Sequence, residues 1–286
     1  MALPFTFYYV LKDSYSYLSS SIRTDLDLNQ YDFFKYALFL DIPEYYTLLH
    51  PFKKDPYQLR QAFTSSKMPL FIKECLDIAK KNDNPNQQFF CYSLLLGYLF
   101  QKEMVLFVQQ NPVKKKPAIE TEKMIDAYFF EKNEQRSLSS VNIADYFFDS
   151  FSLSEEDIEL LEKPMKRIFG FFCTENYFQQ AYQQAATYFN YFTRSKTNLK
   201  KIGYVLYDFF FSHQKEKRKA VTFLYPKKID TALLHLTQKN ESIETVYANF
   251  LKTAATIADL INQYFVYDNP KPFLKYFQLP IKNKEL

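Results

Sequence analysis

Glycine is the feature that most constrains this chain, because its 286 residues contain only 3 glycines, against a usual share of about 7%. Glycine enters left-handed backbone conformations freely, so hairpin turns, β-bulges and phosphate-binding loops all depend on it. A chain so poor in glycine is not expected to form a β-sheet protein or a nucleotide enzyme with a glycine-rich loop. We therefore predict an all-α fold, a compact multi-helix bundle.

Apolar residues recur at helical spacing along most of the chain, as expected for helices with one buried face. The ranges with this spacing are 6–18, 30–40, 68–81, 87–109, 118–132, 154–172, 175–192, 198–211 and 243–265. The stretch 87–109 is apolar on most sides, so it is predicted to be the central helix, with Leu94, Leu95, Tyr98 and Val105 buried. Ser154 and Asp157 have the spacing of a capping box. The prolines assigned to loops are Pro51, Pro56, Pro85, Pro112, Pro117, Pro226, Pro270 and Pro272.

The length of the chain allows one large domain or two small ones. We predict a single domain over 1–286. The sequence SLSS near residue 140 is the one candidate boundary, and it would separate a core bundle (1–140) from a helical C-terminal extension (141–286).

The cysteines and the N-terminal sequence favour a cytoplasmic protein. Cys75, Cys91 and Cys173 are an odd set flanked by apolar residues, which is typical of buried, reduced thiols. The N-terminal segment has no basic region before its apolar residues, so it does not resemble a signal peptide. No apolar run is expected to reach the ~20 residues of a membrane span.

Residues Phe90–Phe130, which read FCYSLLLGYLFQKEMVLFVQQNPVKKKPAIETEKMIDAYFF, resemble the centre of bacterial zinc-dependent phospholipase C proteins of the Firmicutes type. In that family a long helix bears His-x3-Asp-x3-His, and a second helix bears His-x3-Glu with a nearby Ile-Asp. Shorter segments that begin at Pro4, Tyr36, Phe63 and Ser242 are similar to other parts of the family. The resemblance implies a compact helical bundle around a cluster of zinc ions.

Carried over position by position, the resemblance implies that most metal ligands have been replaced. The positions that would hold ligands are Phe7, Asp41, Ser66, Gln101, Val105, Gln109, Ala118 and Glu122. Only Asp41 and Glu122 keep a ligand type, and Asp126 lies just beyond them. Zinc prefers imidazole, thiolate and carboxylate donors, so we expect no zinc or other cofactor, no metal site and no catalytic residues. A residual acidic site would consist of Asp41, Glu122 and Asp126.

Three functions are compatible with this pattern. The first is a non-catalytic member of the family, a pseudoenzyme that serves as a binding or scaffold module, with a protein partner or a small ligand in the vestigial cleft. The second is a phosphodiesterase or phospholipase C-type hydrolase with a reduced or relocated metal site. The third is a basic binder of membrane surfaces or nucleic acid, which would use the lysine clusters at 114–116, 200–201 and 215–219. The net charge of only +4 makes nucleic acid the less favoured target.

Overall fold

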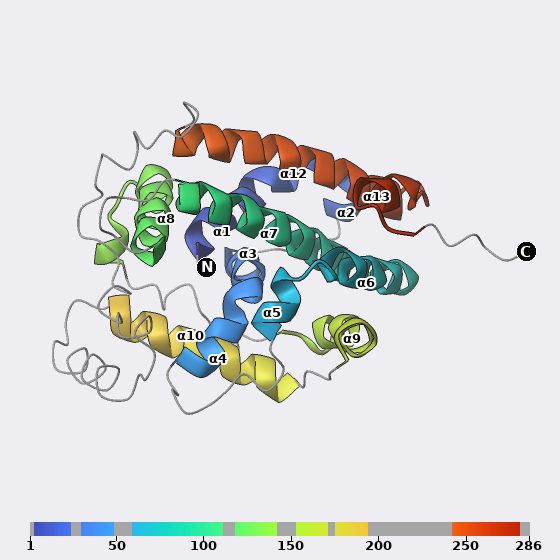
Figure 1. Ribbon diagram of the computed structural model, residues 1–286, viewed down its shortest axis with the longest axis horizontal. Coiled ribbons are helices and arrows are strands. Elements are labelled where there is room, and N and C mark those ends of the chain that lie inside the picture. The colour runs from blue at the N-terminus through green and yellow to red at the C-terminus, as the bar shows by residue number, and fades with distance from the viewer. Residues whose placement is uncertain are drawn as a thin grey trace, which may run out of the picture.

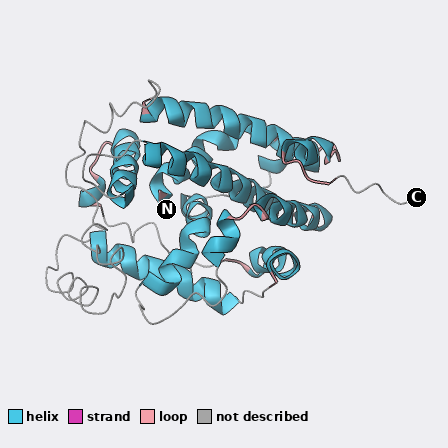
Figure 2. Cartoon of the chain, in the orientation of Figure 1, coloured by secondary structure: helices cyan, strands magenta, loops and turns pink. Residues whose placement is uncertain are grey.

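The computed structural model describes residues 3–23, 30–48, 59–110, 118–141, 153–170, 175–193 and 242–280. Every regular element in these ranges is a helix, and none is a strand (Figure 2). The helices pack into a bundle (Figure 1). The predicted all-α fold is therefore confirmed for the described part of the chain.

Most predicted helices are present with nearly the predicted bounds. The α-helices are α1 (Pro4–Ser14), α2 (Ser20–Arg23), α3 (Gln30–Leu38), α4 (Ile42–Leu48), α5 (Leu59–Thr64), α6 (Met68–Asn82), α7 (Pro85–Gln110), α8 (Ala118–Glu134), α9 (Glu155–Pro164), α10 (Glu175–Thr193), α12 (Ile243–Phe265) and α13 (Lys271–Tyr276). Short 3-10 helices are η1 (Tyr15–Tyr17), η2 (Phe39–Asp41) and η3 (Leu138–Ser140), and η5 (Met165–Phe169) is a π-helix. The sequence reading missed α2, α4, α5 and α13, and the helix predicted at 198–211 lies outside the described residues.

Helix α7 runs through the middle of the bundle, with α12 along one side and α4 and α10 on the other (Figure 1). Its side chains Leu94, Leu95 and Tyr98 are buried, as predicted. The same prediction is wrong for Val105, which is half-exposed, whereas Met104 next to it is buried. The last turns of α7 thus direct a different face toward the core than the sequence suggested.

Helix α7 is also long and apolar enough to cross a membrane, judged by length and composition alone. The expectation that no segment reaches this limit is therefore wrong. However, 67% of its most apolar window is buried inside the bundle, which is the position of a core helix in a folded domain.

Helix α12 lies across the N-terminal helices and shares their core. Its apolar face packs on α7 and α1, and polar contacts fix both of its ends. The Tyr247 hydroxyl donates to Oδ2 of Asp13 at 2.7 Å, and the backbone N–H of Ser19 donates to Oδ1 of Asn262 at 2.9 Å. Helix α12 is thus part of one packed core with residues before position 140, while the single-domain assignment for the whole of 1–286 stays a prediction.

The capping box predicted at the start of α9 is confirmed. Oγ of Ser154 accepts from the backbone N–H of Asp157 at 3.1 Å, and Oδ2 of Asp157 accepts from the N–H of Ser154 at 3.1 Å. Asp157 is also buried beside α3, where the Tyr36 hydroxyl donates to it and Lys35 lies 3.7 Å away. Burial raises the pKa of Asp157, although Lys35 and the Ser154 bonds act against this. The carboxylate of Asp157 therefore caps the N-terminus of α9 and also contacts two side chains of α3.

The two described cysteines, Cys75 on α6 and Cys91 on α7, are free and fully buried. Burial raises the pKa of both thiols, and the thiolate is the reactive form. In a Cys173→Ser variant we expect an aromatic disulfide reagent to label them about a thousandfold or more slowly than in denaturant, since labelling requires the small unfolded fraction. Labelling of either thiol in the folded protein at the rate of a small-molecule thiol would contradict this burial.

Candidate functional site

A small hollow lies where α1, η2 and α7 meet, and three of the eight candidate ligand positions line it: Phe7, Asp41 and Gln101. The other lining residues are apolar: Leu3, Ala37, Leu40, Gly97, Phe100 and Met104. Its volume is about 10 Å³, which is room for roughly one water molecule. Three of the positions carried over from the resemblance, on three separate elements, therefore meet at one point in the fold.

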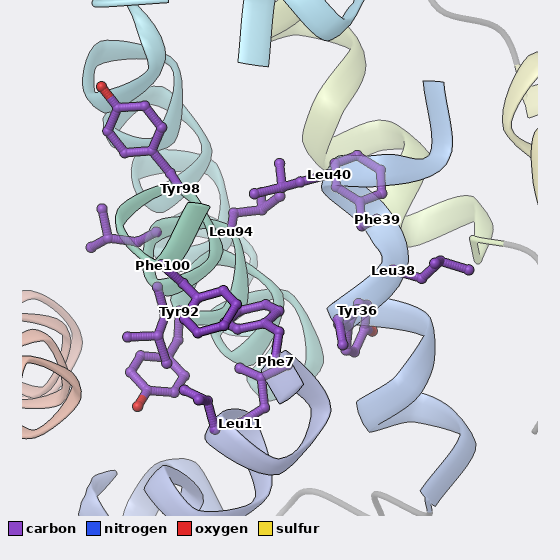
Figure 3. Close-up of a cluster of buried hydrophobic side chains, with 14 of the residues drawn as sticks. Phe7, Leu11, Tyr36, Leu38, Phe39, Leu40, Tyr92, Leu94, Tyr98 and Phe100 are labelled. Carbon is purple, nitrogen blue, oxygen red and sulfur yellow. The ribbon is translucent and has the colours of Figure 1, made fainter. Parts of the chain in front are cut away.

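Aromatic and aliphatic side chains fill this hollow around Gly97. The ring of Phe7 stacks on that of Phe100, with centroids 5.2 Å apart and planes at 24° (Figure 3). A Cβ atom at position 97 would lie 2.9 Å from Cδ1 of Leu40 and 3.0 Å from Cε1 of Phe7. Glycine fits here because the side chains of Leu40 and Phe7 would have to shift to admit a methyl group.

The polar edge of the hollow is a contact between the other two positions. Nε2 of Gln101 on α7 donates to Oδ1 of Asp41 at 3.2 Å. Asp41 ends η2 and is only 5% exposed, so this donor helps to compensate a carboxylate that has lost most of its water. The contact connects the α3–η2 segment to the central helix.

The other positions predicted on α7 do not reach the hollow. Val105 is half-exposed and Gln109 is exposed, and neither lines it. Instead Met104, Phe107 and Val108 are buried, because the inward face of α7 is offset by one residue from the i, i+4, i+8 row that begins at Gln101. The resemblance predicts that Gln101, Val105, Gln109, Ala118 and Glu122 share one cleft, and this prediction is wrong for Val105 and Gln109.

Of the remaining candidates, Ser66 and Glu122 do not line the hollow. Ser66 is exposed in the turn between α5 and α6. Ala118 is the first residue of α8, and its side chain lies outside the described residues. Glu122 is buried on α8 and does not line the hollow.

Asp126 has a different role from the one that the resemblance implied. It is fully buried on α8, and its Oδ1 accepts from the backbone N–H of Thr6 at 2.6 Å and from Oγ1 of Thr6 at 2.9 Å. Thr6 is the third residue of α1, and the residue before that helix, Leu3, provides no side-chain cap. The N–H groups of a first helical turn lack intrahelical acceptors and favour negative charge. Asp126 therefore caps α1 from another helix.

These placements decide whether the hollow fits zinc. Its donors are one carboxylate and one neutral amide, and a phenyl ring stands at the third position, whereas zinc prefers imidazole, thiolate and carboxylate donors. Within the described residues, no group of three His, Cys, Asp or Glu side chains could hold a metal ion, so Asp41, Glu122 and Asp126 do not converge. All three histidines of the chain lie outside those residues. The hollow does not fit the metal that the resemblance implied.

The sequence reading missed the burial of Lys123 on α8. Residues 121–127 of α8 are all buried, and Lys123 is 7% exposed. Desolvation lowers its pKa well below the usual value, and the negative charges of Asp126 and Glu122 oppose this only in part. A lysine between two acidic residues usually indicates a solvated face, so the sequence held no signal for this burial.

The lowered pKa of Lys123 makes stability depend on pH. Unfolded lysine has a pKa of about 10.4, so between the folded pKa of Lys123 and that value the unfolded chain binds more protons, and stability rises with pH. Relative to Lys123→Met, the wild type should gain up to about 1.4 kcal/mol per pH unit in this window. Urea unfolding of both proteins at several pH values measures this gain. The matched control is exposed Lys81→Met, whose curve should run parallel to that of the wild type, and a parallel curve for Lys123→Met would contradict the prediction.

Comparison of the chain with protein-family models, with curated proteins and with solved structures finds no match. The resemblance to zinc-dependent phospholipase C therefore rests on the motifs in the sequence alone.

Proposed function

We propose that this protein is a non-catalytic relative of the zinc-dependent phospholipase C family and that it serves as a binding or scaffold module in the cytoplasm. One observation carries the proposal: Phe7, Asp41 and Gln101, which correspond to ligand positions in three separate family motifs, line a single hollow. Positions that are distant in sequence are thus brought together as in a metal site, but their side chains now form a packed contact.

The state of the hollow supports a scaffold more than a receptor for a small ligand. A volume of about 10 Å³ is far below the ~300 Å³ or more of ordinary ligand pockets. The ring of Phe7 and the Gln101–Asp41 hydrogen bond occupy the space where donors and a substrate would stand. Any partner would accordingly bind at another surface of the bundle.

No specific observation favours the other two functions. A hydrolase with a reduced metal site would need Asp41, Glu122 and Asp126 together, and Asp126 is used to cap α1. The lysine clusters of a basic binder lie outside the described residues. The hydrolase stays as an outcome of the tests below, and the basic binder stays a prediction.

The wild-type protein tests the proposal directly. Purified protein is expected to hold no stoichiometric zinc by elemental analysis and to leave phosphatidylcholine intact, because activated water and charge neutralisation in this family come from the metal. Gln101→His alone should not create activity, since one imidazole does not complete a metal site. One or more zinc ions per chain, removable by a chelator with loss of phosphodiesterase activity, would overturn the proposal.

A designed metal site tests whether the hollow retains the geometry of a ligand set. In the double variant Phe7→His/Gln101→His, two imidazoles would join the carboxylate of Asp41, a donor set that suits zinc or cobalt(II). Zinc at about a hundredfold excess over its dissociation constant should stabilise the folded variant by about 2.7 kcal/mol, and cobalt(II) should give a tetrahedral absorption band. The matched control, Phe7→His/Gln109→His, carries its second histidine on the exposed residue 109 and should show neither effect. Equal responses from the two variants would contradict an inherited site.

A further inference from the structure

We draw no further inference here: the strongest candidate, the groove of about 180 Å³ between α6 and the segment around α13, has polar side chains that are already paired, Lys73 with Asp77, Asp77 with Tyr264 and Glu74 with Arg167, and nothing in the structure shows what covers its apolar rim of leucines and prolines.

Discussion

Asp126→Ala is expected to lower the free energy of unfolding by about 3–5 kcal/mol, the usual cost of removing one partner from a buried charged contact. The substitution leaves the N–H and the hydroxyl of Thr6 without their acceptor. It also removes a negative charge that acts on buried Lys123. Urea denaturation followed by far-UV circular dichroism measures the loss.

Milder variants separate the capping contact from the charge. Asp126→Asn keeps an oxygen that can accept from the Thr6 N–H, so its loss should be smaller, about 1–3 kcal/mol. Thr6→Val removes only the hydroxyl contact and should cost about 1 kcal/mol. Asp259→Ala, on the exposed side of α12, should stay within about 0.5 kcal/mol of the wild type. If Asp126→Ala behaved like Asp259→Ala, the role of Asp126 as a cap for α1 would be wrong.

The helices that the sequence reading found and missed differ in how they begin. The long helices could be predicted because their apolar spacing extends over several turns, and α9 also because its cap and its capping partner are three residues apart. Pro85 and Pro272 were predicted to lie in loops, yet they are the first residue of α7 and the second residue of α13, and Pro43 is the second residue of α4. A proline in the first turn loses no hydrogen bond, because that N–H has no intrahelical acceptor. Prolines that stand in the first turn of a helix were therefore misinterpreted as residues that end a helix.

The candidate site could be predicted only in part, for a different physical reason. Helical spacing shows which residues share a face of α7 but not how that face is rotated against its neighbours. Gln101 therefore reaches the hollow, whereas Val105 and Gln109, predicted to lie in the same cleft, do not. The contact between Asp126 and Thr6 joins residues 120 positions apart. A cap provided by another helix has no local sequence pattern, so nothing near Thr6 or Asp126 could have indicated it.

Phe7→Ala is the second substitution with a large expected effect, a loss of about 3–5 kcal/mol, because the variant replaces a buried ring by a cavity. Phe7 is 4% exposed, and its ring packs against Gly97 and stacks on the ring of Phe100. Thermal and urea unfolding measure the loss. The matched control is Tyr267→Ala, whose side chain is 72% exposed and which should change stability by less than about 0.5 kcal/mol.

A double-mutant cycle with Gly97 tests whether the Phe7 ring fills the hollow or only borders it. In the wild type, Gly97→Ala forces its new methyl group against Leu40 and Phe7, and such overpacking costs about 1–3 kcal/mol, while the better helix propensity of alanine returns about 1 kcal/mol. In the Phe7→Ala background the ring is gone and the end of Leu40 can move into the vacated space, so only the gain in helix propensity should remain. Gly97→Ala is then expected to be stabilising, with a coupling energy of about 1 kcal/mol or more between the two positions. Additive effects would mean that the ring does not occupy the space beside Gly97. They would also contradict the proposal that Phe7, at a position that corresponds to a metal ligand in the family, serves in core packing.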